Sequence, residues 1–278
     1  MNATVYSWAR SIANTSTTNN QANNDDSYRQ KWLTGLGARP AATMRLFVFP
    51  FAGGDVSAFY RWQQWLPDNC ELVRVQLPGR GNRRDDTMPA TMAEMARTLT
   101  HAFSSALDKP FVFFGYSMGA LIAYELLQQF KRLGLAKPAL FCAAACSPPH
   151  LHHHQWSAMS DSEIIQVLID SDSWLQDIPL AQLQENLPLI KKDLLFCQAY
   201  THSAKSLSEP LDCPLMTIAG AQDAIAPAAR VLDWWQYTTA SCVSRCVAGG
   251  HFFLFDSLQL PKIMLRELQP LLSIKSFA

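Results

Sequence analysis

Short apolar segments recur along the chain between longer segments that mix polar and apolar residues. Six of the short segments are four to eight residues long, and each stops at or near a proline or glycine. A short apolar run bounded by turn residues is typical of a strand buried on both faces. We therefore predict strands at residues 46–49, 72–76, 111–114, 139–146, 215–219 and 243–247.

The segments between these strands carry the periodicity of amphipathic helices. Thr91 and Glu94 have the spacing of a capping box at the start of one helix, and Gly134 is placed to end another. We predict helices at residues 92–107, 118–133, 227–237 and 260–272. Strands that alternate with helices of this length predict an α/β fold with a mostly parallel sheet covered on both faces.

Residues 148–211 interrupt the alternation of strands and helices. They contain helical patterns, including a second capping box at Ser160 and Glu163, but no clear strand. A helical insertion after a core strand is what a lid over an active site would look like. Residues 1–30 are rich in Asn, Ser and Thr and are expected to form a disordered tail, which leaves residues 31–278 as one domain.

The composition narrows the class of protein. The chain has 278 residues, of which 49% are hydrophobic and 17% charged, as expected of a globular protein with a sizeable core. Its formal net charge is zero, so no overall field favours nucleic acid or an anionic membrane as a partner. No apolar run approaches the roughly 20 residues of a membrane span, and the N-terminus has no apolar signal region.

The cysteines indicate a reducing compartment. The chain has seven of them, an odd number, and none forms a C-x-x-C pair. Buried, reduced thiols explain this usage better than a metal site or a disulfide framework does. We therefore expect a cytoplasmic protein.

The segment 115–119, Gly-Tyr-Ser-Met-Gly, has the G-x-S-x-G pattern. The pattern alone is common, but here it lies between a predicted strand and a predicted helix, as a nucleophile elbow requires. A plain strand-to-helix turn with a capping serine would not need both glycines. We therefore predict that Ser117 is the nucleophile of an α/β-hydrolase that cleaves acyl esters or thioesters.

A serine hydroxyl needs a base, and two residues downstream are placed to supply a relay. Asp223 and His251 each follow a predicted strand, so both should lie at the carboxyl edge of the sheet beside Ser117. The order Ser, Asp, His along the chain is that of α/β-hydrolases. Either residue alone could belong to an ordinary loop, but three in order make coincidence a poor explanation.

The loop after the first strong strand is the candidate for an oxyanion hole. Residues 49–54 read Phe-Pro-Phe-Ala-Gly-Gly, and the glycine pair lets backbone N–H groups face the site. We assign the two donors to the N–H groups of Ala52 and Met118. A plain glycine turn is the alternative interpretation.

Other conspicuous residues suggest less chemistry. The adjacent residues 152–154, all His, point in different directions and have no partner at ligand spacing, so we expect a solvated loop and no metal. Residues 79–84 lack the lysine and hydroxyl of a phosphate-binding loop, and their arginines are more typical of a solvated loop. Trp234 and Trp235 are expected to pack their helix against the sheet. We expect no cofactor.

Taken together, these motifs resemble the type II thioesterases of nonribosomal peptide and polyketide synthesis. The resemblance is nearly collinear from Trp32 to about Leu272. It rests on residues 49–54, 59–62, 76–83, 115–120, 211–223 and 249–254. One departure is visible, because Tyr116 stands where the family usually has His.

The resemblance implies an editing enzyme whose partners are acyl- or peptidyl-carrier domains bearing phosphopantetheine thioesters. Ser117 would attack the thioester carbonyl with His251 as base and Asp223 as its orienting acid. Carrier domains are usually acidic, so a local basic surface is expected near the entrance, with Arg80, Arg83, Arg84, Lys191 and Lys192 as candidates. We expect a monomer with no nucleic-acid or membrane partner.

Two other functions remain open on the sequence. The same residues would serve an esterase that acts on small soluble esters or acyl-coenzyme A. A catalytically inactive scaffold that binds carriers is a third possibility, which the complete Ser, Asp and His set argues against.

Overall fold

The computed structural model describes residues 26–152, 155–200, 209–256 and 259–273. Residues 1–25 of the predicted tail, and His153 and His154, lie outside the described residues. Residues 26–32 form a helical turn region in which Tyr28 packs on His101, with ring centroids 4.9 Å apart.

A seven-stranded sheet with the order β1-β3-β2-β4-β5-β6-β7 forms the centre of the molecule. All pairings are parallel except that of β1 with β3. The strands are β1 (Leu33–Thr34), β2 (Met44–Phe49), β3 (Cys70–Val75), β4 (Phe111–Tyr116), β5 (Leu140–Ala144), β6 (Leu215–Gly220) and β7 (Cys242–Val247). The six predicted strands are all present. Strand β1 was not predicted, because a strand of two residues shows no periodicity.

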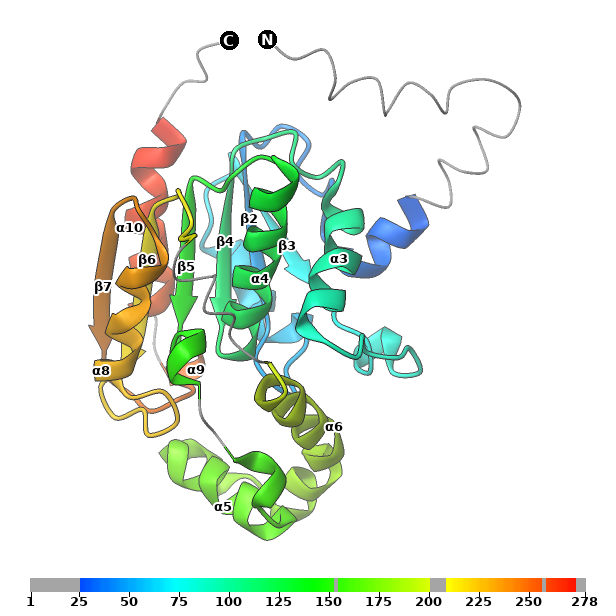
Figure 1. Ribbon diagram of the computed structural model, residues 1–278, viewed down its shortest axis with the longest axis vertical. Helices are drawn as coiled ribbons and strands as arrows, with labels where there is room; N and C mark the ends of the chain where they lie inside the picture. The colour runs from blue at the N-terminus through cyan, green and yellow to red at the C-terminus, as the bar shows by residue number, and fades with distance from the viewer. Residues whose placement is uncertain (1–25, 153–154, 201–208, 257–258, 274–278) are drawn as a thin grey trace.

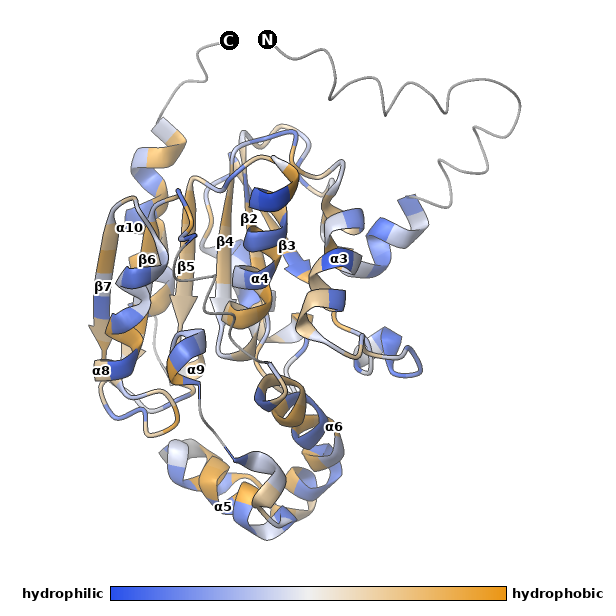
Figure 2. Cartoon of the chain, viewed as in Figure 1, coloured by the Kyte–Doolittle hydropathy of each residue, from blue (hydrophilic) through white to orange (hydrophobic). Residues whose placement is uncertain are grey.

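Helices cover both faces of the sheet (Figure 1). The face that carries Phe47 and Phe113 packs on α3 (Met92–Phe103) and α4 (Met118–Leu133), where Phe47 lies 4.8 Å from Phe103 between ring centroids. The opposite face packs on the 3-10 helix η1 (Val56–Gln64) and on α10 (Gln259–Ser273). Apolar residues therefore fill the strands while polar residues gather on the outer sides of the helices (Figure 2).

The predicted helix at 227–237 is divided into α8 (Ala228–Val231) and the 3-10 helix η6 (Leu232–Tyr237). Trp234 is fully buried, and its indole N–H donates to the Cys146 carbonyl at 2.8 Å. The prediction for Trp235 is wrong, because that side chain is 61% exposed. Neighbouring residues on a 3-10 helix point about 120° apart, so both rings could not face the sheet.

Between β5 and β6 the chain forms helices and, within its described residues, no strand. These are η3 (Pro149–Leu151), η4 (Trp156–Ala158), α5 (Asp161–Ser171), η5 (Ser173–Asp177) and α6 (Leu180–Gln198). The capping box at Ser160 and Glu163 is complete. Leu168, Leu183 and Leu187 help form a small apolar cluster of their own. We call residues 149–198 the helical segment; it lies beyond the sheet edge to which the parallel strands point (Figure 1).

Candidate active site

Ser117 occupies a strained turn between β4 and α4. Its backbone has φ 51° and ψ −118°, a region that residues other than glycine rarely adopt. The Ser117 N–H donates to the Ala144 carbonyl at 2.8 Å, which ties the turn to the next strand. The side chain therefore projects at the carboxyl edge of the sheet above the N-terminus of α4, as a nucleophile elbow requires.

The two glycines beside Ser117 are required by contact with neighbouring backbone. A Cβ on Gly115 would lie 2.4 Å from the Ala120 Cα, and one on Gly119 would lie 2.2 Å from the Phe49 carbonyl oxygen. Real Cβ atoms do not approach that closely, so any side chain at either position would open the turn. The prediction that both glycines serve close packing is confirmed.

His251 and Asp223 meet Ser117 in one hydrogen-bonded chain. The His251 Nε2 atom lies 3.0 Å from the Ser117 Oγ atom, and its Nδ1 atom lies 2.9 Å from one Asp223 carboxylate oxygen. The other carboxylate oxygen accepts the N–H groups of Ile225 and Ala226 at 2.9 and 2.8 Å. His251 is 4% and Asp223 5% exposed, so water has little access to the chain of groups. This geometry orients the imidazole with Nδ1 toward the acid and Nε2 toward the hydroxyl.

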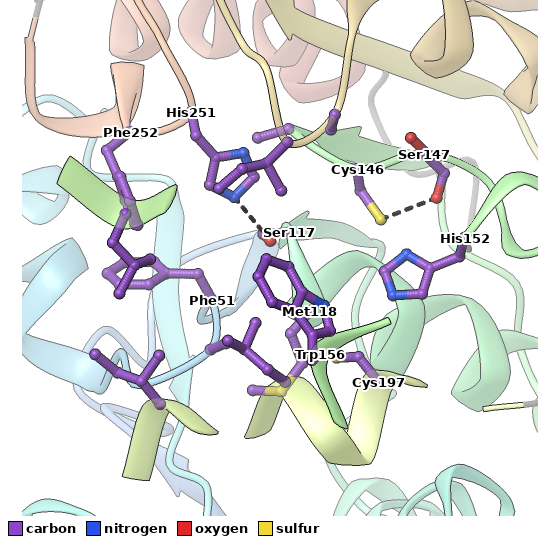
Figure 3. A pocket seen from close by; sticks show the side chains of 17 residues that line it. Phe51, Ser117, Met118, Cys146, Ser147, His152, Trp156, Cys197, His251 and Phe252 are labelled. Carbon is purple, nitrogen blue, oxygen red and sulfur yellow. Dashed lines mark hydrogen bonds between the residues drawn. The ribbon is translucent and has the colours of Figure 1, made fainter. Parts of the chain in front are cut away.

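A cavity opens in front of these residues (Figure 3). Its volume is about 610 Å³ including space open to solvent, and apolar side chains from the sheet edge and from the helical segment form most of its wall. Ala52 and Met118, the predicted oxyanion donors, both line it together with Ser117. Trp156, which is 3% exposed, lines both the cavity and a second groove on the outside of the helical segment.

Another groove adjoins the cavity on the side of α6. It runs between residues 51–58 and the face of α6 that carries Gln182 and Asn186. Phe51, Ala52 and Phe252 line both the groove and the cavity, so the two adjoin.

Two cysteines also line the cavity, but they are not candidate nucleophiles. Cys146 and Cys197 are buried, and Cys146 donates its thiol hydrogen to the Ser147 carbonyl at 3.2 Å. Burial raises the pKa of the Cys146 thiol well above its usual range, and the nearby Asp223 raises that pKa further. Burial likewise raises the pKa of the Cys197 thiol. Both thiols stay protonated near neutral pH, and a protonated thiol is a poor nucleophile.

Arg80 and Arg83 are not the solvated basic residues that the sequence suggested. Arg80 is 4% exposed and forms a bidentate ion pair with Asp193 of α6, with N–O distances of 2.7 and 2.8 Å. Arg83 is buried against the ring of Trp32, at 4.0 Å from its centroid, and its Nε atom pairs with Asp86 at 2.8 Å. The prediction that either arginine belongs to an exposed docking surface is therefore wrong. Asp193 and Trp32 lie on other elements, which no local pattern could indicate.

The Asp193 carboxylate has a second partner close to the cavity. One of its oxygens accepts the Gly53 N–H at 2.8 Å, and Arg80 also donates to the Gly54 carbonyl at 2.9 Å. The ion pair thus holds the loop that contains Ala52 against α6. Sequence reasoning missed Asp193 because a lone acidic residue in a helix gives no signal.

Neither a membrane span nor a metal site is found within the described part of the chain. No helix there is long and apolar enough to cross a bilayer. The same residues contain no group of three or more His, Cys, Asp and Glu side chains placed to hold an ion.

The parallel sheet, the strained serine at the strand–helix turn, and the His and Asp that follow later strands define this molecule as an α/β-hydrolase. The sequence profile of the Thioesterase domain family matches residues 44–269, and the chain belongs to that family. It is therefore a hydrolase of the thioesterase type.

Individual relatives agree with this assignment. The gramicidin S biosynthesis protein GrsT of Aneurinibacillus migulanus is 28% identical over 88% of this chain and 96% of its own length. The RedJ thioesterase of the prodiginine pathway of Streptomyces coelicolor is 33% identical, with a TM-score of 0.75 over 82% of this chain and 91% of RedJ. The type II thioesterase BorB of the borrelidin cluster is 25% identical, with a TM-score of 0.75 over 85% of this chain and 97% of BorB. The resemblance to type II thioesterases read from the motifs is confirmed.

Proposed function

We propose that the protein hydrolyses acyl groups from the phosphopantetheine arm of carrier domains in nonribosomal peptide or polyketide synthesis. The observation that carries this proposal is the hydrogen-bonded chain Ser117–His251–Asp223, which faces an apolar cavity beside the groove on the side of α6. The names of the relatives support the pathway, since GrsT, RedJ and BorB are named for biosynthetic pathways, and the type II thioesterase YbtT is named for a nonribosomal peptide and polyketide pathway.

Acylation begins with Ser117. As its Oγ atom attacks the thioester carbonyl carbon, His251 Nε2 takes the hydroxyl proton across the 3.0 Å contact. Asp223 then faces an imidazolium and stabilises its charge through the Nδ1–H hydrogen bond. The tetrahedral intermediate collapses, the carbon–sulfur bond breaks, and the pantetheine sulfur leaves as a thiol with the proton from His251. An acyl ester on Ser117 remains.

Deacylation repeats the sequence with water as the nucleophile. His251 accepts a proton from a water that attacks the acyl ester, and it returns that proton to the Ser117 oxygen as the free acid forms. The low exposure of His251 and Asp223 keeps the charged pair strong because little water screens it.

The N–H groups of Ala52 and Met118 are assigned to the oxyanion that forms in both steps. Met118 is the first residue of α4, and the first N–H groups of a helix have no intrahelical acceptor. Ala52 lies beside Gly53, whose N–H is held by Asp193 and so fixes the loop. Donors fixed before the reaction stabilise developing charge without reorganisation, and loss of one costs about 10²- to 10³-fold in kcat.

The groove suits the pantetheine arm. It adjoins the cavity that contains Ser117, and it combines apolar side chains with the amides of Gln182 and Asn186. We therefore propose that the helical segment, within residues 148–211 of a single domain, acts as the lid that forms one wall of the acyl site. A single chain supplies every residue of the site, so a monomer suffices. All seven cysteines are free, as the reducing cytoplasm would leave them.

Carrier binding would then rely on the basic residues that remain exposed. Arg84 and Lys192 are exposed, whereas Lys191 forms an ion pair with Asp161 at 2.6 Å. An Arg84→Glu, Lys192→Glu variant should raise KM for an acyl-carrier without affecting a small thioester. The effect should weaken at high salt, because exposed charges are screened.

A panel of substrates tests the proposed function. Ser117→Ala should lower turnover of an acyl-carrier by roughly 10⁴- to 10⁶-fold. The wild-type kcat/KM should be higher for an acyl group on a carrier than for the same group on coenzyme A or on a simple alcohol. Equal values would favour the soluble-ester alternative, and failure of a fluorophosphonate to label Ser117 would favour the inactive scaffold.

A further inference from the structure

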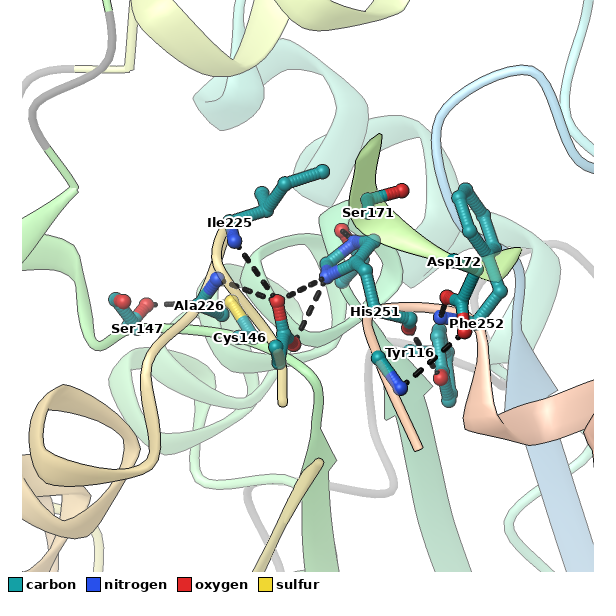
Figure 4. A network of polar contacts seen from close by, with 12 residues as sticks. Tyr116, Cys146, Ser147, Ser171, Asp172, Ile225, Ala226, His251 and Phe252 are labelled. Atoms are coloured by element: carbon teal, nitrogen blue, oxygen red, sulfur yellow. Dashed lines mark hydrogen bonds and ion pairs between the residues drawn. The ribbon is translucent and has the colours of Figure 1, made fainter. Parts of the chain in front are cut away.

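The backbone of the loop around His251 is held from two sides (Figure 4). On the sheet side, the hydroxyl of Tyr116 donates to the His251 carbonyl at 2.6 Å and accepts the Leu254 N–H at 3.3 Å. Tyr116 is fully buried, and its ring packs 5.2 Å from the Phe253 ring between centroids. One hydroxyl therefore fixes the peptide that carries the imidazole and the turn that follows it.

On the other side, the end of α5 binds three successive N–H groups of the same loop. The Asp172 carboxylate accepts the Gly250 N–H at 3.2 Å with one oxygen and the Phe252 N–H, in a short contact, with the other. Between them, the His251 N–H donates to the Ser171 carbonyl at 3.1 Å. Asp172 is only 6% exposed, and charge-assisted hydrogen bonds in such a setting are stronger than neutral ones.

Gly250 permits this close approach. A Cβ at that position would lie 1.9 Å from the Ser171 carbonyl oxygen and 2.8 Å from Asp172 Oδ1. The second glycine of the Gly-Gly-His motif is thus required by contact with the helical segment. The loop around His251 and the end of α5 are therefore in direct, hydrogen-bonded backbone contact.

We infer that Asp172 and Tyr116 are positioning residues for His251, and that Asp172 makes the position of the histidine depend on the seating of the helical segment. The inference rests on the proposed role of His251 as the base. When α5 is seated, the carboxylate and the Ser171 carbonyl hold residues 250–252, and Nε2 lies 3.0 Å from the Ser117 hydroxyl. When α5 moves away, the N–H groups of residues 250–252 lose these three acceptors, while the contacts of the loop with Tyr116, Gln222 and Asp223 remain.

The same arrangement gives Tyr116 a role. The family usually has histidine at this position, and the Tyr116 side chain is not part of the hydrogen-bonded chain Ser117–His251–Asp223. Its hydroxyl supplies both a donor and an acceptor to the His251 loop, which explains why a polar ring is buried beside the nucleophile.

Two substitutions that each change one polar group test the inference. Tyr116→Phe deletes the hydroxyl and keeps the ring, and Asp172→Asn keeps the shape but leaves one N–H without an acceptor. Displacement of a catalytic group by about 1 Å costs on the order of 10²-fold in rate. We expect each variant to lower kcat by about 10- to 100-fold, with KM for a small thioester within about twofold, and to slow fluorophosphonate labelling of Ser117 in proportion.

Asp170→Asn is the matched control, because Asp170 is an exposed residue of the same helix and bonds only to Gln166 among the contacts described. It should leave kcat unchanged. The inference is overturned if both test variants retain wild-type kcat, or if their losses are confined to KM. If Asp172→Asn does not fold, Asp172→Glu takes its place, since it keeps the charge but displaces the carboxylate from the two N–H groups, and wild-type kcat in that variant would overturn the role of Asp172. Separate failure of the proposed function would show as full activity in Ser117→Ala or His251→Ala, which the positioning variants cannot mimic.

Discussion

Replacement of Asp193 by alanine should both destabilise the protein and impair its chemistry. The carboxylate is buried against Arg80, with side-chain exposures of 1% and 3%, and it also accepts the Gly53 N–H. The variant leaves a guanidinium in a site from which water is excluded, and it frees the loop that contains Ala52. The two effects arise from one carboxylate that joins α6 to the sheet.

The expected magnitude follows from the burial of the pair. Removal of one partner of a buried ion pair costs about 3–5 kcal/mol, because the remaining charge has no compensation. In a chain of this size each kcal/mol lowers Tm by roughly 2–4 °C, so the expected fall is about 6–20 °C. Lys137 and Asp212 form a comparable pair whose side chains are 61% and 60% exposed, and Asp212→Ala should cost only about 0.2–1 kcal/mol.

Thermal unfolding followed by circular dichroism, together with kcat on a small thioester, measures both effects. A double variant, Arg80→Met with Asp193→Leu, separates them, since no charge is left buried and stability should largely return. Activity should remain low in the double variant because Gly53 still lacks its acceptor. If Asp193→Ala shifted Tm no more than Asp212→Ala does, the buried pair would not anchor α6 and the reasoning would be refuted.

Three further predictions follow from single side chains. Burial raises the pKa of the Cys213 thiol to about 12, so at pH 8 iodoacetamide should alkylate the exposed Cys246 in the folded protein and reach Cys213 only after unfolding. Mass spectrometry checks this, and early alkylation of Cys213 would contradict it. Trp156→Ala should join the cavity to the outer groove and shift preference toward longer acyl chains, whereas Trp235→Ala, at an exposed ring, should not. An unchanged profile of kcat/KM against chain length would exclude Trp156 as the partition. Ser160→Ala removes the cap of α5 and should cost about 1 kcal/mol in urea unfolding, and no measurable loss would mean that the cap is redundant.

The sequence alone determined the elements whose signals are local. Buried parallel strands are continuous apolar runs, so β2 to β6 were visible, whereas β7 is a largely exposed edge strand whose sequence includes Ser244 and Arg245. The glycines around Ser117 mark a turn that no other residue could form. Asp223 and His251 could be chosen because each follows a strand, and parallel strands end at one edge. These inferences needed only the spacing of residues along the chain. Within a short segment, that spacing decides which side chains share a face and where a tight turn must form.

Tertiary structure decided which polar side chains are buried and with what partners. Arg80 and Asp193 are 113 positions apart, and the Asp172 carboxylate and the Phe252 N–H are 80 apart, so no window of sequence contains either pair. The sequence of residues 79–84 would also suit a solvated loop, which is what it suggested for Arg80. These charges are buried only because the helical segment packs against the carboxyl edge of the sheet. A buried charge is costly unless an opposite charge or a hydrogen-bond partner lies beside it, and here those partners are distant in sequence.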